Sequence, residues 1–128
     1  MKIVHAYPPN WEDIKKAFKP DRNYVFTYGD TLYAPDTNPD DVLISHEEVH
    51  ARQQSNPEEW WKRYIGDPKF RAEQEIEAYR AQYKFYCNKY KSRELRFSFL
   101  KRIATDLSSN NYGSLMSFIE AYGEISRG

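Results

Sequence analysis

The sequence is poor in cysteine, in long apolar runs and in any excess of charge of one sign. Cys87 is the single cysteine among 128 residues, which excludes an internal disulfide framework and a zinc site built from thiolates. No stretch approaches the roughly 18 uncharged residues of a membrane span, and residues 1–10 lack the apolar run of a signal peptide. We therefore expect a soluble, cytoplasmic protein with no membrane partner.

The charges of the chain are balanced. Lysine plus arginine and aspartate plus glutamate number 19 each, so the formal net charge is zero. A protein that binds nucleic acid through a broad basic surface would carry a positive excess. Basic residues do gather over residues 84–102, but the acids between them indicate a solvated helix face. No nucleic-acid partner is expected.

Aromatic residues are plentiful, with eleven tyrosines, seven phenylalanines and three tryptophans. Each ring can bury a large apolar area, so we expect a core built more from rings than from aliphatic side chains. The length is that of one ordinary domain, and no linker or repeat divides the chain. A single domain over residues 1–128 is predicted.

The first third of the chain predicts a small antiparallel sheet or hairpin. Residues 24–33 contain two β-rich runs around Gly29-Asp30, a pair that suits a hairpin turn. One short helix is expected over residues 11–18, because apolar residues recur there at helical spacing and Pro20 follows.

From residue 38 onward the sequence predicts successive helices. Three helix-capping residues each precede a proline, as Asn38-Pro39, Asn56-Pro57 and Asp67-Pro68. Gly66 is expected to end the second helix, and Ser117 and Glu120 form a capping box that opens the last one. Before the last helix, the predicted helices cover residues 39–54, 57–65, 68–91 and 93–107, and Gly66 ends the one over residues 57–65. The expected fold class is therefore α+β and mostly helical.

His46-Glu47-Glu48-Val49-His50 is an H-E-x-x-H motif inside the first of these long helices. Helix positions four apart differ by about 40° around the axis, so both imidazoles can reach one metal ion. Glu47 lies about 100° from His46, which lets its carboxylate contact a metal-bound water without binding the metal. The motif predicts metal-assisted hydrolysis, with zinc acidifying the water and Glu47 taking the proton. The alternative is a pair of buried histidines bonded to carbonyl groups without a metal.

A catalytic zinc usually takes three protein ligands and leaves one position for water. Residues 72–79 offer Glu73, Glu75 and Glu77 on the longest predicted helix. At 100° per residue, Glu75 lies nearest to the aromatic face that should pack against the motif helix. We predict Glu75 as the third ligand, with Glu73 as the first substitute and His5 as a weaker one.

An H-E-x-x-H motif followed by a helix with Glu75-x-Glu77-Ala78 resembles the gluzincin metallopeptidases. The resemblance implies a zincin-like fold, zinc ligands at both motif histidines and at Glu75, and a general base at Glu47. The chain departs from the family at Tyr79, where many members have an aspartate that can steady a zinc-binding imidazole.

The wider sequence is similar to small gluzincin-like proteins of bacteriophages and prophages. The similarity covers roughly residues 24–122 and includes Trp60-Trp61 and the later segment Asp106-Leu-Ser-Ser. It implies a zinc hydrolase fold and does not imply a substrate. If the protein is of phage origin, the expected compartment is the cytoplasm of the host cell.

A peptidase site also needs a surface that binds the substrate and a hydrogen-bond donor for the oxyanion. The hairpin over residues 24–33 either offers an edge for a substrate strand or simply covers one side of the core. A hydrogen-bond donor for the oxyanion is expected near the metal, and Tyr112 is the candidate. The alternative for Tyr112 is a packed loop residue.

Together these features predict a zinc-dependent metallopeptidase with Zn²⁺ as cofactor and a peptide or protein as substrate. The alternative is a non-catalytic interaction module that keeps the metallopeptidase fold and binds zinc for structure. Glu47 favours the enzyme, because a structural zinc site needs no general base. The short chain and the missing aspartate at position 79 favour the module.

Overall fold

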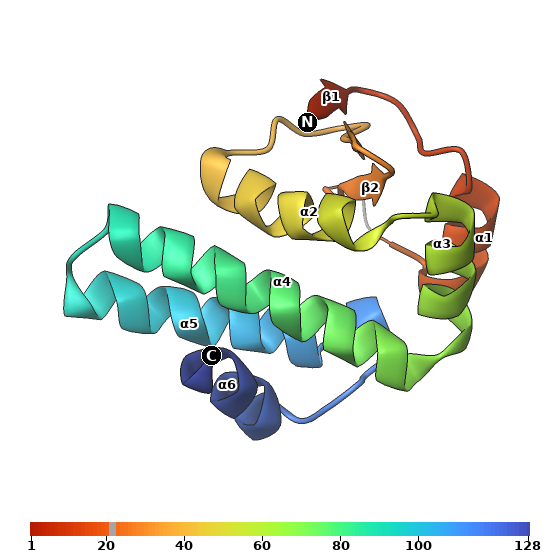
Figure 1. Cartoon of the computed structure of the whole chain (residues 1–128). Helices are drawn as coiled ribbons and strands as arrows, with labels where there is room; N and C mark the ends of the chain where they lie inside the picture. Colours follow the sequence, from red (N-terminus) through yellow and green to blue (C-terminus); the bar gives the residue numbers. More distant parts are fainter. Residues whose placement is uncertain (21–22) are drawn as a thin grey trace.

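Residues 1–20 and 23–128 are described by the computed structural model, and they form a small sheet and a set of packed helices (Figure 1). The strands are β1 (Lys2–Val4), β2 (Phe26–Tyr28) and β3 (Thr31–Tyr33). The helices are α1 (Trp11–Phe18), α2 (Asp41–Gln53), α3 (Pro57–Gly66), α4 (Pro68–Lys89), α5 (Arg93–Ser108), the short 3₁₀ helix η1 (Asn110–Tyr112) and α6 (Phe118–Arg127). This arrangement confirms the α+β, mostly helical fold.

The sheet is mixed rather than purely antiparallel. Strands β2 and β3 form the expected hairpin, and Gly29 in its turn has a left-handed φ of 65° that glycine adopts easily. Strand β1 adds to the other edge of β3 and runs parallel to it. The sequence did not predict β1, because three mostly exposed residues are too short to show an alternating pattern.

Helix boundaries follow the capping residues with two corrections. Asn56, Asp67 and Ser117 accept backbone hydrogen bonds at the starts of α3, α4 and α6, as predicted. Helix α2 begins two residues later than Pro39, because Asp40 is the cap and accepts from the Leu43 N–H. Likewise, α3 ends through Asp67 and not through a glycine cap, and Gly66 is its last helical residue.

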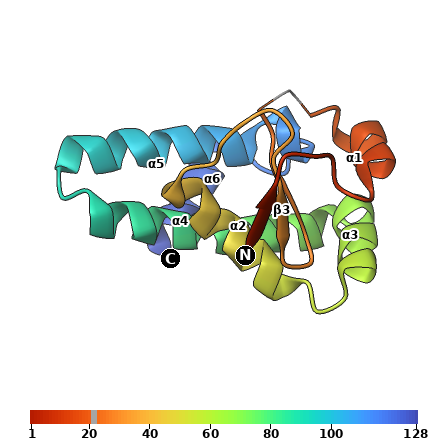
Figure 2. The same cartoon turned by 90° about the horizontal axis from the view of Figure 1, so that it is seen from above.

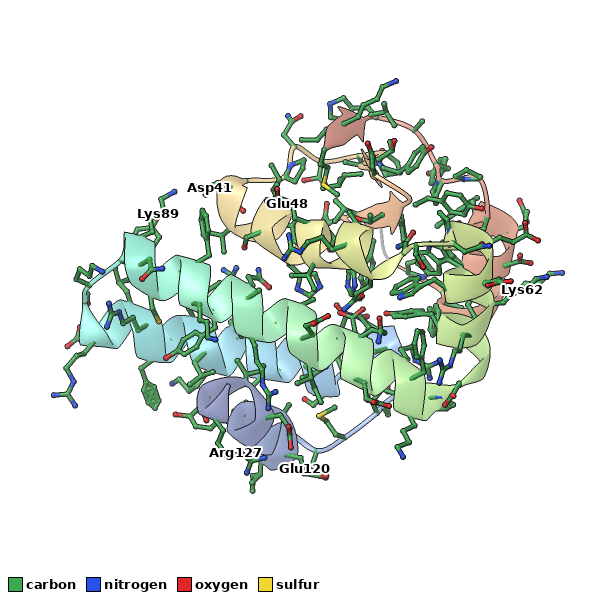
Figure 3. All side chains as sticks on the ribbon, viewed as in Figure 1. Asp41, Glu48, Lys62, Lys89, Glu120 and Arg127 are labelled. Carbon is green, nitrogen blue, oxygen red and sulfur yellow. The ribbon has the colours of Figure 1, made fainter. Side chains whose placement is uncertain are left out.

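Helix α4 is the central element of the helical layers. It packs against α2 on one side and against α5 and α6 on the other (Figure 1). Seen from above, α1 and α3 lie next to each other at one end of the molecule (Figure 2). Charged side chains such as Glu48 project outwards, and Lys89 joins α4 to Asp41 of α2 at 2.6 Å (Figure 3).

Two separate clusters make up the hydrophobic core. We call the one between α1, β2 and α3 the aromatic cluster; its buried members are Ile14, Phe26, Trp60, Trp61 and Tyr64. The aliphatic cluster lies between α4, α5 and α6 and contains Val42, Tyr79, Phe99, Leu100, Ile103, Ala104, Leu107, Ala121 and Ile125. The prediction of a core dominated by rings is therefore correct for one end of the molecule and wrong for the other. Within the described part of the chain, no helix is both long and apolar enough to cross a membrane.

Candidate metal centre

The two motif histidines lie on the face of α2 that packs against α4. His46 and His50 are buried, and Glu75 of α4 points towards them with only 2% of its surface exposed. Glu75 Oε1 lies 3.1 Å from His46 Nε2 and 3.2 Å from His50 Nε2. The two Nε2 atoms are 3.2 Å apart. Three potential ligand atoms from two helices therefore converge on one point.

The chemistry and spacing of these groups fit a metal ion. Ligand atoms about 2.0–2.1 Å from a tetrahedral zinc ion lie about 3.3 Å from one another. The three atoms of His46, His50 and Glu75 are separated by 3.1 to 3.2 Å, close to that value. Two imidazoles and one carboxylate can hold a metal and leave a fourth position open.

The substitutes considered for the third ligand lie elsewhere. Glu73 is exposed, on a part of α4 turned away from the histidines. His5 is also exposed, and its Nδ1 pairs with the Ala34 carbonyl oxygen at 2.9 Å. Of the candidates named from the sequence, the structure brings only Glu75 to the motif histidines.

A glutamine fixes the orientation of each imidazole. His50 Nδ1 donates to Gln53 Oε1 at 2.8 Å, and Gln53 Nε2 donates to the Glu77 carboxylate at 2.6 Å and to the Gln74 carbonyl at 3.1 Å. Because Glu77 and the carbonyl only accept, the amide oxygen of Gln53 must face His50. Neutral His50 then carries its proton on Nδ1 and directs the Nε2 lone pair to the point where the three ligand atoms converge, as a metal ligand must.

On the other imidazole, Gln82 supplies the partner that the sequence seemed to lack. His46 Nδ1 donates to Gln82 Oε1 at 3.0 Å, while the Tyr79 ring lies edge-on to His46 with centroids 4.4 Å apart. Glu75, Tyr79 and Gln82 recur at positions i, i+4 and i+7 of α4, so one helix face holds all three. That spacing was available in the sequence and could have identified Gln82.

The buried charges explain the electrostatics of the centre. Burial alone would lower the pKa of His50, but the Glu75 carboxylate outweighs it and raises that pKa to about 9. Burial would raise the pKa of Glu75, yet His50 and His46 hold it well below its usual range. The Tyr64 hydroxyl also donates to Glu75 Oε2, at 2.5 Å. A carboxylate this deeply buried requires a cation beside it, either a proton on His50 or a metal ion.

Glu47 is held beside His46 by the sheet. Its Oε1 accepts from the buried Thr27 hydroxyl at 2.9 Å, and its Oε2 lies 3.7 Å from His46 Nε2. The same hairpin is fastened to the helices, because the Thr27 carbonyl accepts from Gln54 at 2.8 Å and from Trp61 at 3.0 Å. At Thr27, therefore, the hairpin packs on the protein, and its carbonyl is not available to pair with a substrate strand.

Tyr112 is held in place by hydrogen bonds at its hydroxyl and its backbone carbonyl. Its hydroxyl pairs with that of Tyr79 at 2.7 Å, and burial raises the pKa of Tyr112 well above its usual range, so it remains a donor. The buried Arg71 guanidinium donates to the carbonyls of Tyr112, Tyr64 and Ile65. Gly113 is required beside it, because its φ is 84° and a side-chain Cβ there would lie 3.1 Å from Arg71 Nη2. Arg71 was not identified from the sequence, since its partners are backbone carbonyl groups, which no residue type marks.

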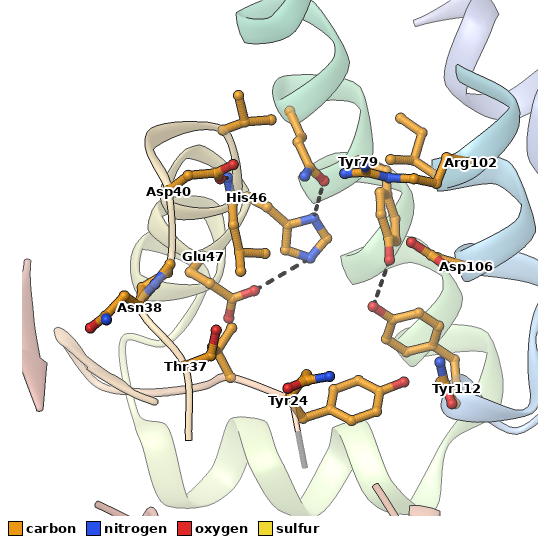
Figure 4. A pocket seen from close by; sticks show the side chains of 18 residues that line it. Tyr24, Thr37, Asn38, Asp40, His46, Glu47, Tyr79, Arg102, Asp106 and Tyr112 are labelled. Carbon is orange, nitrogen blue, oxygen red and sulfur yellow. Dashed lines mark hydrogen bonds and ion pairs between the residues drawn. The ribbon is translucent and has the colours of Figure 1, made fainter. Parts of the chain in front are cut away.

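An open cavity of about 420 Å³ reaches His46 and Glu47, with Tyr79 and Tyr112 on its far side (Figure 4). A smaller pocket of about 60 Å³ shares His46 and Glu47 with this cavity and is also lined by His50 and Glu75. The cavity gives a substrate-sized molecule access to the side of the centre on which Glu47 lies.

Comparisons of this chain with protein-family models, with curated proteins and with solved structures find no match. The functional assignment therefore depends on the geometry of the centre.

Proposed function

We propose that this protein is a zinc-dependent hydrolase, a metallopeptidase of the gluzincin type. The observation that carries the proposal is the convergence of His46, His50 and Glu75 at the spacing of tetrahedral zinc ligands, with Glu47 beside the open cavity. The resemblance of the H-E-x-x-H and E-x-E-A segments to gluzincins supports the same assignment.

When bound, zinc supplies Lewis-acid chemistry that acidifies water and polarises a carbonyl group. Glu47 accepts the proton of the attacking water and is held for this task by Thr27. The Tyr112 hydroxyl donates to the carbonyl oxygen as it becomes negatively charged. Gln53 and Gln82 keep the Nε2 lone pairs of the two histidines directed at the metal.

The rival function is a zinc-binding interaction module without catalysis. The specific observation in its favour is the deep burial of all three ligands, each no more than 5% exposed. Against it stands Glu47, whose buried carboxylate would have no purpose in a purely structural site. For either function we propose the cytoplasm as the compartment, where the free Cys87 would remain reduced.

The test measures zinc content and peptide cleavage on the same preparations. Wild-type protein purified without chelators should contain about one zinc per chain by mass spectrometry and cleave members of a peptide library. Glu75→Ala should lose most of the zinc, because only two ligands remain. Glu47→Gln should keep the zinc and lose about 10²–10⁴-fold in cleavage rate. Tyr112→Phe should also keep it and lose about 10²-fold.

Glu48→Gln is the matched control, because this neighbouring carboxylate is exposed and lies outside the centre. It should retain both zinc and cleavage. Zinc without cleavage in the wild type would favour the interaction module. No zinc in any preparation, even after zinc is offered, would overturn both functions.

A further inference from the structure

Asp106 is a charged group in the cavity that the proposed chemistry does not use. It comes from α5 and lines the cavity together with His46 and Glu47. Figure 4 shows it on the wall that also carries Tyr79 and Tyr112. The side chain is half-buried, and its carboxylate has no hydrogen bond or ion pair with another described residue.

The surroundings of Asp106 leave its charge only partly compensated. Burial raises the pKa of its carboxyl group, and the positive charges of Arg102 and His46 oppose that shift. Arg102 lies one helical turn away, is exposed, and places its guanidinium 5.2 Å from the centre of the Phe99 ring instead of against the carboxylate. Among the described residues that line the cavity, Arg102 is the only lysine or arginine, against three acids in Asp40, Glu47 and Asp106.

We propose that Asp106 binds a positively charged group of the substrate and so makes the cavity selective for cationic peptides. This inference depends on the proposed function, because it assumes that the substrate enters the cavity beside the metal centre. The cation is either the free amino terminus of a peptide or the side chain of a lysine or arginine. Both present N–H donors that pair with a carboxylate, and pairs of opposite charge are stronger where water is partly excluded.

The experiment uses three probes that share one zinc-binding hydroxamate group. Acetylglycyl-norleucine hydroxamate carries no cation, glycyl-norleucine hydroxamate has a free amino terminus, and acetylglycyl-lysine hydroxamate has a cationic side chain. Their affinities for the zinc-loaded protein are measured by titration calorimetry, which does not require catalysis. We expect one cationic probe to bind roughly tenfold more tightly than the neutral probe, and its identity shows which source of charge is bound.

Asp106→Asn should abolish this preference and leave the affinity for the neutral probe unchanged. Arg102→Gln should increase the preference severalfold, because it removes a nearby positive charge that repels a cationic probe. Glu48→Gln is the control for the loss of one negative charge and should behave as the wild type. An equal loss of affinity for all three probes in Asp106→Asn, or a preference that persists in it, would overturn the inference.

The outcomes also separate this inference from the proposed function. If none of the probes binds because the protein takes up no zinc, the metal centre is wrong and the inference falls with it. If the preference depends on Asp106 in a protein that cleaves no peptide, the cation site stands and the hydrolase is refuted. If peptides are cleaved but no probe is preferred, the hydrolase stands and the role of Asp106 is refuted.

Discussion

The aromatic and the aliphatic cluster differ in what they offer to the metal centre that lies between them. The rings of the aromatic cluster carry polar atoms that bond to the site: Tyr64 donates to Glu75, Trp61 to the Thr27 carbonyl, and Trp60 to Gln74 at 2.8 Å. Among the buried members of the aliphatic cluster, only Tyr79 carries such a group, and its hydroxyl pairs with that of Tyr112. The aromatic end therefore adds hydrogen bonds to Glu75 and to residues around the ligands, whereas the aliphatic end mainly supplies packing.

From this difference we expect substitutions at the aliphatic end to lower the free energy of unfolding without changing zinc binding. Leu107 is completely buried, so Leu107→Ala should lower the free energy of unfolding by about 2–5 kcal/mol. Urea denaturation measures this loss, and zinc content below the transition should remain that of the wild type. A variant that stays folded yet no longer binds zinc would show that the two ends are not separate.

Gln53 of α2 joins His50 to Gln74 and Glu77 of α4. The loss of these hydrogen bonds should lower the zinc affinity more than the free energy of unfolding. Gln53→Leu leaves the Nδ1 proton of His50 without its acceptor and should reduce zinc affinity by about 10–100-fold in competition with a chelating dye. The exchange Gln53→Glu with Glu77→Gln keeps an acceptor for His50 and a donor opposite it. This double variant should recover most of the affinity, whereas an unchanged loss would mean that Gln53 acts only by packing.

The smallest of the three effects should come from a single hydroxyl at the aromatic end. Tyr64→Phe keeps the ring in its cluster but removes the donor to Glu75 Oε2, and zinc affinity should fall by roughly tenfold. Tyr86→Phe is the matched control, because the Tyr86 ring stacks on Phe99 at the aliphatic end, 4.0 Å between centroids. Equal effects of the two variants would remove the distinction between the clusters.

Local sequence patterns predicted most of the helical framework. Asn56, Asp67 and Ser117 marked helix starts because each cap acts on backbone groups a few residues away. The choice of Glu75 over Glu73 followed from the helical period alone. Asp40, in contrast, is the cap of α2 in place of Asn38, because residues two positions apart can fulfil the same capping role and local preference does not decide between them.

What the sequence did not predict depends on how elements pack. Gln53 acquires its role only when α2 and α4 lie face to face, and Arg71 only when η1 returns beside α3. Strand β1 forms through pairing with a segment almost thirty residues away. The ring-rich composition likewise gave no information on how the rings would be divided between the two ends.

The connection between α3 and α4 is a single residue long. Asp67 is both the C-cap of α3, which carries Tyr64, and the N-cap of α4, which carries Glu75. An inserted residue would turn α4 by about 100° relative to α3. Tyr64 could then reach Glu75 only if α4 also changed register against α2 and carried Glu75 away from the histidines. We expect this junction to tolerate substitutions of side chains far better than any change in its length.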